Sequence, residues 1–172
     1  MKQPLSLRTA IPLTVTVWVV AACAAAAPLV LPPALQAGPD ARLVLTASAR
    51  GMQIYECRAG QWTFVAPQAE LFDAAGRVIG THGAGPYWQA GDGSRVVASV
   101  TARADAPVAG AIPWLLLSAR PDNGNKGLLA GTTHIQRVNT AGGSAPATPC
   151  TQPGQPLRVP YTADYHFFRT AS

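Results

Sequence analysis

The sequence predicts an all-β chain, a single-domain sandwich or barrel of roughly eight short strands with few or no helices. Three observations predict it. Apolar residues recur at every second position in several short runs, which is the side-chain period of a strand. The chain carries 16 glycines and 16 prolines, and they interrupt these runs at short intervals. No long segment shows the 3.6-residue apolar period of an amphipathic helix.

The first strands are predicted from three segments. A short apolar run covers 43–45. The next strand opens at Gly51 and covers 52–58, where successive side chains alternate between two faces. Ala59-Gly60 has the length of a tight turn and leads into a strand over 61–65, which predicts a hairpin.

Between this hairpin and the centre of the chain the signals are mixed. Residues 67–72 predict a short helix, because a proline stands at the entry position. Residues 73–76 form a turn into a strand over 77–80. A turn-rich segment, 81–94, follows, and its Asp92-Gly93 pair predicts a type I′ hairpin turn.

The next two strands have the clearest patterns. Residues 95–103 alternate apolar and polar side chains, which predicts a half-buried strand. Its predicted core face carries Val96, Ala98, Val100 and Ala102. Residues 112–117 form a continuous apolar run of strand length, and we expect them to be buried on both faces.

The C-terminal part is predicted to contain two more strands around a loop. The first covers 132–139. Residues 141–160 contain five prolines, which predict a long loop without regular structure. The last strand covers 161–169. Its core face is predicted to carry Tyr161, Ala163, Tyr165 and Phe167.

Residues 1–27 have the organisation of a secretory signal peptide. Lys2 and Arg8 precede an uncharged apolar stretch that ends in small residues. A proline- and alanine-rich linker follows over 28–40, and the β domain covers 41–172. A retained membrane span is the alternative, but prolines leave an apolar stretch of barely sufficient length.

Two kinds of cleavage fit this leader. The alanines at 24–26 satisfy the small-x-small rule of an ordinary signal peptidase. The sequence Val-Ala-Ala-Cys at 20–23 also resembles a bacterial lipobox, in which Cys23 would become the lipidated N-terminus. Apolar residues follow Cys23, which favours the ordinary signal. Membrane contact is expected only through the leader or through a lipid on Cys23.

The cysteine count predicts one disulfide. Of three cysteines, Cys23 lies in the leader, which leaves Cys57 and Cys150 as a pair. In an oxidising compartment two lone cysteines form a disulfide. A zinc site is the alternative, but two cysteines without CxxC spacing give it little support.

The charge distribution argues against a nucleic-acid partner. Without Lys2 and Arg8 the chain keeps 11 basic and 8 acidic residues, a net charge of +3, and these charges are scattered. Binding to phosphates requires clustered lysines and arginines.

The chain resembles domain of unknown function family 3455 over nearly all of its length after the linker. The matching motifs are Gly-Met-Gln-Ile-Tyr-Glu-Cys at 51–57, His-Gly-Ala-Gly-Pro at 82–86 with Trp88, Asp-Gly-Ser at 92–94, Ile-Pro-Trp-Leu-Leu-Leu at 112–117, Ile-Gln-Arg-Val-Asn-Thr at 135–140 with Gly142, Gly143 and Cys150, and Val-Pro-Tyr-Thr-Ala-Asp-Tyr at 159–165. This resemblance implies a secreted or envelope location in bacteria or fungi and no established activity. His134 and His166 depart from the family pattern.

The candidate site is the segment 81–94. It places His82, Tyr87 and Trp88 on a Gly-rich loop, where flat apolar faces with polar edges suit a small molecule, a glycan or a protein partner. The alternative is that Tyr87 and Trp88 are core side chains beneath the loop.

Arg137 is the basic residue expected near this segment. It stands between Ile135 and Val138 on a predicted strand, and we expect it to pair with Asp92 or Glu56. Such a pair serves a scaffold as often as an anion site.

Catalytic and metal-binding patterns are weak. The histidines at 82, 134 and 166 form no local metal-binding pair, so no metal and no cofactor is predicted. His82, Asp92 and Ser94 are close in sequence, but a triad is defined by geometry, and no Gly-x-Ser-x-Gly elbow is present. With 8 acidic residues, several of them in turns, paired glycosidase carboxylates are not expected either.

The sequence therefore predicts an exported protein, periplasmic, secreted or lipid-anchored in the envelope. It favours a non-enzymatic binding or structural domain. An enzyme of unknown reaction centred on His82 and Asp92 is the alternative.

Overall fold

The computed structural model describes residues 30–122, 124 and 126–170. The predicted signal peptide, with both cleavage schemes and Cys23, lies outside the described residues. From Leu31 onward the described chain forms one compact unit. No helix in this part of the chain has the length and apolar content that crossing a membrane would require.

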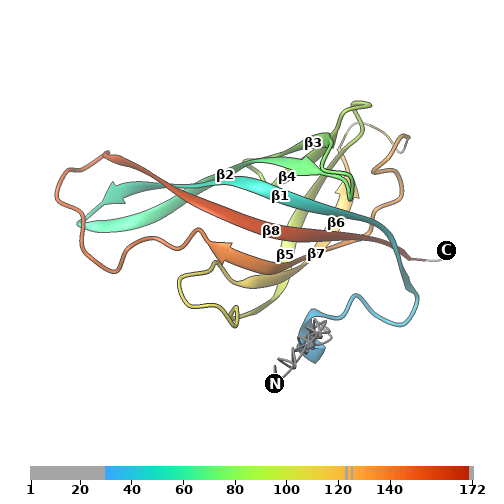
Figure 1. Ribbon diagram of the computed structural model, residues 1–172, viewed down its shortest axis with the longest axis horizontal. Helices are drawn as coiled ribbons and strands as arrows, with labels where there is room; N and C mark the ends of the chain where they lie inside the picture. Colours follow the sequence, from blue (N-terminus) through green and yellow to red (C-terminus); the bar gives the residue numbers. More distant parts are fainter. Residues whose placement is uncertain (1–29, 123, 125, 171–172) are drawn as a thin grey trace, which may run out of the picture. The chain divides into compact units, whose positions relative to one another are not determined.

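Within the described residues, eight antiparallel strands form a closed barrel (Figure 1). Each strand pairs with the next in sequence, and the last pairs with the first. The all-β prediction is confirmed, in its barrel form. The elements are a short 3-10 helix, η1 (Pro33–Leu35), and the strands β1 (Ala41–Arg58), β2 (Gln61–Phe72), β3 (Val78–Gly83), β4 (Tyr87–Ala90), β5 (Arg95–Ala104), β6 (Trp114–Pro121), β7 (His134–Gly142) and β8 (Pro156–Thr170).

β1 is one strand of 18 residues, whereas the sequence predicts two shorter ones. Gly51 lies inside β1 and pairs with Ala69 of β2. A Cβ atom at Gly51 would collide with the carbonyl oxygen of Gln68, so only glycine lets the two backbones approach this closely. The glycine that the sequence suggests as a strand start is therefore a point of close contact between strands.

The predicted hairpin between β1 and β2 is confirmed. Arg58 pairs with Gln61, and the two residues between them, Ala59 and Gly60, have φ angles of 49° and 78°. Positive φ at both central residues is the geometry of a type I′ turn, whose twist matches that of the flanking strands.

β2 runs through residues 67–72, so the helix predicted there is wrong. Pro67 caused the error, because proline suits a strand edge as well as a helix entry. β3 pairs with β2 only from Ala69 to Phe72, which leaves the earlier part of β2 with one unpaired edge. Since Pro67 lies beside this unpaired edge, the N–H that proline lacks is not needed for a hydrogen bond between strands.

Both ends of the loop predicted over 141–160 are also strand. β7 extends to Gly142, and β8 begins at Pro156. Pro156 and Pro160 are four positions apart in β8, and because backbone N–H groups alternate between the two edges of a strand, the nitrogens of both prolines face the same edge. β7 pairs with β8 only from Tyr161 onward, so the two prolines lie where that edge has no neighbouring strand.

A bulge in β5 reverses the faces of its last residues. The pairing with β6 shifts register between Val100 and Ala102. Before the bulge Val96 belongs to the interior core, and after it Ala102 and Ala104 pack outside the barrel while Arg103 faces in. The prediction that Ala102 shares a face with Val96 is therefore wrong, because one extra residue inverts the alternation.

A second apolar cluster covers the outside of the barrel wall. Leu35 of η1 is fully buried against Trp114 and Leu116 of β6. The carbonyl oxygen of Leu35 also accepts a hydrogen bond of 2.6 Å from the Gln136 side chain of β7. Since Leu117 is buried in the interior cluster, the run over 112–117 is buried on both faces, as predicted.

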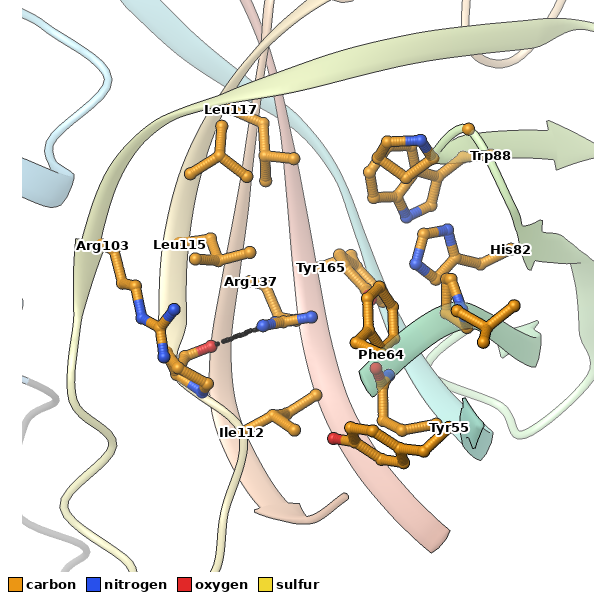
Figure 2. A pocket seen from close by; sticks show the side chains of 17 residues that line it. Tyr55, Phe64, His82, Trp88, Arg103, Ile112, Leu115, Leu117, Arg137 and Tyr165 are labelled. Atoms are coloured by element: carbon orange, nitrogen blue, oxygen red, sulfur yellow. Dashed lines mark hydrogen bonds between the residues drawn. The ribbon is translucent and has the colours of Figure 1, made fainter. Parts of the chain in front are cut away.

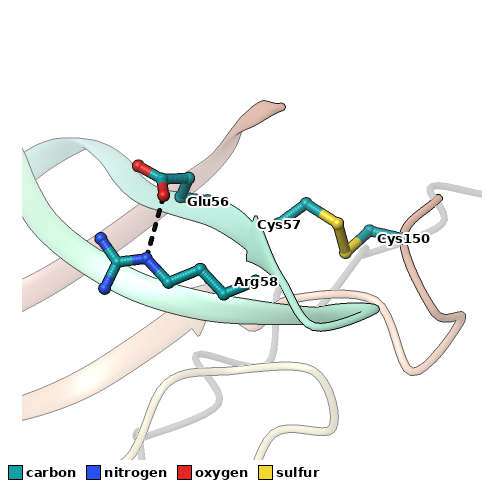
Figure 3. Close-up of a disulfide and its surroundings, with 4 residues drawn as sticks. All are labelled: Glu56, Cys57, Arg58 and Cys150. Atoms are coloured by element: carbon teal, nitrogen blue, oxygen red, sulfur yellow. Dashed lines mark hydrogen bonds and ion pairs between the residues drawn. A yellow bond between two sulfur atoms is a disulfide. The ribbon is translucent and has the colours of Figure 1, made fainter. Parts of the chain in front are cut away.

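Cys57 and Cys150 form the predicted disulfide, with their Cα atoms 5.7 Å apart (Figure 3). Backbone hydrogen bonds run beside it. The Cys57 N–H donates to the Gln155 carbonyl at 2.9 Å, and the Cys150 N–H donates to the Gly60 carbonyl at 3.1 Å. The proline-rich loop 143–155 is thus fastened to the tip of the β1–β2 hairpin.

Candidate functional site: a cavity inside the barrel

The barrel interior contains a cavity of about 770 Å³ (Figure 2). All eight strands contribute to its lining, and most of the lining side chains are apolar or aromatic. Leu115 and Leu117 of β6 and Ile112 just before it form one apolar wall. The volume lies within the range of about 300–1,000 Å³ that is typical of small-molecule sites.

The cavity opens where the barrel wall is shortest. β3 and β4 have 6 and 4 residues, whereas the strands beside them, β2 and β5, have 12 and 10. Because β3 and β4 lie between β2 and β5 but are much shorter, they fill only part of the barrel wall between these two strands. Phe64, Val65 and Val100 line the cavity at this opening and remain 51%, 46% and 54% exposed. We refer to these three side chains as the apolar rim.

An aromatic cluster forms another wall of the cavity (Figure 2). His82 of β3 and Trp88 of β4 are cross-strand partners, and their rings stack at 4.3 Å with an interplanar angle of 15°. Tyr165 of β8 meets both rings edge-on, 5.1 Å from His82 and 5.4 Å from Trp88. Stacked and edge-to-face contacts of this kind are favourable and hold the three rings in place.

His82 is a neutral imidazole at physiological pH. Its side chain is only 3% exposed, and its Nδ1 lies 2.7 Å from the Tyr87 carbonyl oxygen. A carbonyl can only accept, so Nδ1 carries the proton and Nε2 is left as an acceptor. Burial lowers the pKa of His82 to about 3, opposed by the hydrogen bond to Tyr87 and assisted by the charge of Arg137.

Arg137 extends from β7 into the cavity (Figure 2). Its Nε and Nη2 atoms both donate to the Pro113 carbonyl oxygen, at 3.1 and 2.9 Å. The expected pairing with Glu56 or Asp92 is wrong. Glu56 forms its ion pair with Arg58, and Asp92 accepts hydrogen bonds from Ser94 in its own turn and from Leu128 in the β6–β7 loop.

Several buried polar groups line the cavity or lie beside it: the Gln53 amide, the Trp88 indole N–H and the hydroxyls of Tyr161 and Tyr165. The Tyr161 hydroxyl interacts with Gln53 and Tyr165, and Tyr165 also interacts with Arg137. Trp88 Nε1 has no hydrogen-bond partner in the described part of the chain. Burial raises the pKa of both tyrosines, and the charge of Arg137 opposes that rise. A buried polar group without a partner costs about 1–3 kcal/mol. Such atoms around a cavity are groups that a ligand could satisfy.

Asp92 lies in the β4–β5 turn and does not line the cavity. Its Oδ1 accepts from the Ser94 N–H at 3.0 Å and the Ser94 hydroxyl at 2.6 Å, and its Oδ2 accepts from the Leu128 N–H at 2.7 Å. These hydrogen bonds lower the pKa of Asp92. The predicted hairpin turn is present but is not type I′, because Gly93 alone among residues 91–94 has a positive φ.

The family model for proteins of unknown function, DUF3455, matches residues 38–169. The chain is a member of the DUF3455 family. The match confirms the resemblance seen in the sequence, and it contains β1 to β7 and all but the last residue of β8. Searches of curated proteins and of solved structures found no match.

Three of the five candidate residues line the cavity of this DUF3455 protein: His82, Trp88 and Arg137. Tyr87 does not. Tyr87 is the first residue of β4, its side chain faces the opposite way from that of Trp88, and the Arg95 guanidinium lies 4.1 Å above its ring. The backbone of Tyr87 still serves the site, because its carbonyl oxygen fixes the tautomer of His82.

The other two histidines lie away from the cavity lining. His134 contacts the Thr133 hydroxyl at 3.1 Å, and His166 contacts the Gln136 amide oxygen at 3.3 Å. Among the described residues of this DUF3455 protein, no three His, Cys, Asp or Glu side chains gather closely enough to hold a metal ion.

Sequence reasoning did not assign four polar residues to the cavity lining: Gln53, Tyr55, Arg103 and Tyr165. The sequence predicts Tyr165 only as an aromatic core residue. Gln53 carries a detectable signal, because it stands in phase with Tyr55 and Cys57 on the inward face of β1. A polar residue at an inward position of a strand calls for an internal partner. Arg103 gives no such signal, since the bulge that turns it inward is not visible in the alternation.

Proposed function

We propose that this DUF3455 protein is an exported, non-enzymatic binding protein that holds a small apolar molecule inside its barrel. The observation that carries the proposal is the cavity of about 770 Å³, to which all eight strands contribute and which is lined mostly by apolar and aromatic side chains. Eight-stranded barrels have interiors that either fill with side chains or hold one small ligand, and this one leaves room for a ligand.

The apolar rim supports the same proposal. Exposed Phe64, Val65 and Val100 border the opening, so an apolar ligand would bury them when it enters. Burial of apolar surface contributes about 25 cal/mol per Å². A rim of this kind favours the small molecule over the glycan and protein partners that the sequence also allowed.

The export part of the proposal rests on two features. One is the predicted signal peptide at 1–27, with lipidation at Cys23 as its second form. The other is the disulfide between Cys57 and Cys150, which suits an oxidising compartment.

An enzyme centred on His82 and Asp92 requires both side chains to face one site. His82 lines the cavity, whereas Asp92 is bound to Ser94 and Leu128 outside its lining. No observation on this pair favours catalysis over binding.

Titration with N-phenyl-1-naphthylamine, an uncharged apolar dye, tests the binding proposal. We expect dye fluorescence to rise on binding, and the indole N–H resonance of Trp88 to shift in a proton–nitrogen spectrum. Trp88 lines the cavity, while Trp114 lies in the outer cluster, so the Trp114 resonance is an internal control. A Trp88→Phe variant assigns the peak. Absence of binding, or shifts confined to Trp114, would contradict the proposal.

A further inference from the structure

We propose that the molecule held in the barrel is a monocarboxylate with an apolar body, and that Arg137 binds its carboxylate. This inference rests on the proposed function and adds the chemical class of the ligand. It is carried by the charge of the lining, by the hydrogen-bond donors of Arg137 that the protein leaves unused, and by the division of the cavity into a polar and an apolar part.

The charge of the lining is positive. Arg137 and Arg103 both line the cavity, and no aspartate or glutamate is among the described residues that line it. Ion pairs between described residues elsewhere, namely Arg58–Glu56, Arg77–Asp73 and Arg95–Asp122, do not include Arg137. A half-buried guanidinium without a carboxylate partner in the described chain is a site for an anion from outside.

Arg137 keeps hydrogen-bond donors that the protein does not use. The Pro113 oxygen takes two of the five N–H donors of the Arg137 guanidinium. The Trp88 indole nitrogen, which can only donate, also lines the cavity and lacks a partner in the described chain. The charge of Arg137 acts on Tyr165, which places the two groups near one another.

A carboxylate supplies what these donors lack. It only accepts hydrogen bonds, it offers about four lone-pair sites, and its planar shape matches a guanidinium. Of the two arginines that line the cavity, Arg137 is half-buried and Arg103 is exposed, so a single carboxylate inside the cavity is matched by Arg137. A neutral alcohol or amide offers the guanidinium an acceptor but no charge.

The rest of the cavity fits the apolar body of such a molecule. Ile112, Leu115 and Leu117 lie on one side, and the aromatic cluster of His82, Trp88 and Tyr165 lies on the other (Figure 2). His82 belongs with the apolar part, because its neutral ring presents an acceptor and no charge.

The test compares decanoate with decan-1-ol, which share a chain length and differ in charge, by calorimetric titration of the disulfide-bonded protein. We expect decanoate to bind at least about tenfold more tightly. Arg137→Met should reduce decanoate affinity to the level of the alcohol. Arg120→Met removes the same charge from an exposed position on β6 and should preserve the preference.

Two further measurements separate a failed inference from a failed fold or a failed function. Binding of N-phenyl-1-naphthylamine to the Arg137→Met protein shows that the cavity is intact, and Arg137→Lys should keep part of the preference because it retains the charge. Dye binding with equal affinities for acid and alcohol overturns the carboxylate inference alone. If neither the dye nor decanoate binds the natural protein, both proposals fall.

Discussion

The buried imidazole of His82 makes the stability of the barrel depend on pH. In the unfolded chain its pKa is near the ordinary value of about 6.5, and burial lowers it to about 3 in the native protein. Between these values the unfolded state binds more protons than the native state, so the free energy of unfolding falls as the pH falls. The loss begins below about pH 6.5 and is complete near pH 3.

A His82→Gln variant should remove this dependence, since glutamine can donate to the Tyr87 carbonyl but does not titrate. We expect the free energy of unfolding of the natural protein to fall by about 2 kcal/mol more than that of the variant between pH 6.5 and pH 5. Denaturant unfolding of both proteins at a series of fixed pH values measures this difference in the free energy of unfolding. Burial also lowers the pKa of half-buried His166, so His166→Gln is a comparison with the same sign and a smaller effect. Parallel pH profiles for the natural protein and His82→Gln would refute this account.

At this scale the sequence identified part of the site. His82 and Trp88 are brought together because they are cross-strand partners on one hairpin. Asp92 is close to them in sequence but follows β4, whose 4 residues at a rise of about 3.4 Å place the two ends of the strand roughly 10 Å apart. Local composition therefore found the right segment, while the length of a strand decided which of its residues share a cavity.

At the scale of the elements, period-2 alternation predicted most strands and failed where a strand has a bulge or an unpaired edge. The bulge after Val100 turned Arg103 inward. Pro67 and Pro156 lie on edges that have no neighbouring strand, and the edge of β2 at Pro67 borders the cavity opening. These features depend on which strands stop early. That is a property of the whole sheet, so no local pattern of apolar residues encodes it.

The short helix η1, which precedes β1, packs against the barrel, and a substitution of Leu35 tests whether this packing stabilises the fold. Its side chain is fully buried against β6, so Leu35→Ala should lower the free energy of unfolding by about 2–4 kcal/mol through lost burial and a cavity. Leu31 packs against the same cluster but is only partly buried, and Leu31→Ala should cost less. Thermal or denaturant unfolding compares the two. Equal stability of Leu35→Ala and the natural protein would mean that η1 does not contribute to the barrel.

At the scale of the whole molecule, the barrel closes by pairing β8, the last strand, with β1, the first. The disulfide adds a covalent connection at one end of this arrangement. It joins residues 93 positions apart and fastens the loop 143–155 to the β1–β2 hairpin. The Tyr55 hydroxyl of the cavity lining donates to the Gly143 carbonyl of the same loop at 2.6 Å, so the fastened loop also positions a cavity residue.

Replacing both cysteines, Cys57→Ser with Cys150→Ser, should therefore destabilise the protein. The chain-entropy model assigns roughly 4–5 kcal/mol to a crosslink closing a loop of this length, and we expect a loss of about 2–5 kcal/mol in denaturant unfolding. Arg58→Gln is a control on the same hairpin, because its ion pair with Glu56 is exposed to solvent and should contribute little to stability (Figure 3). A thiol assay on denatured, unreduced protein should find neither cysteine free. Two reactive thiols, or a double variant as stable as the natural protein, would remove both this crosslink and its support for export.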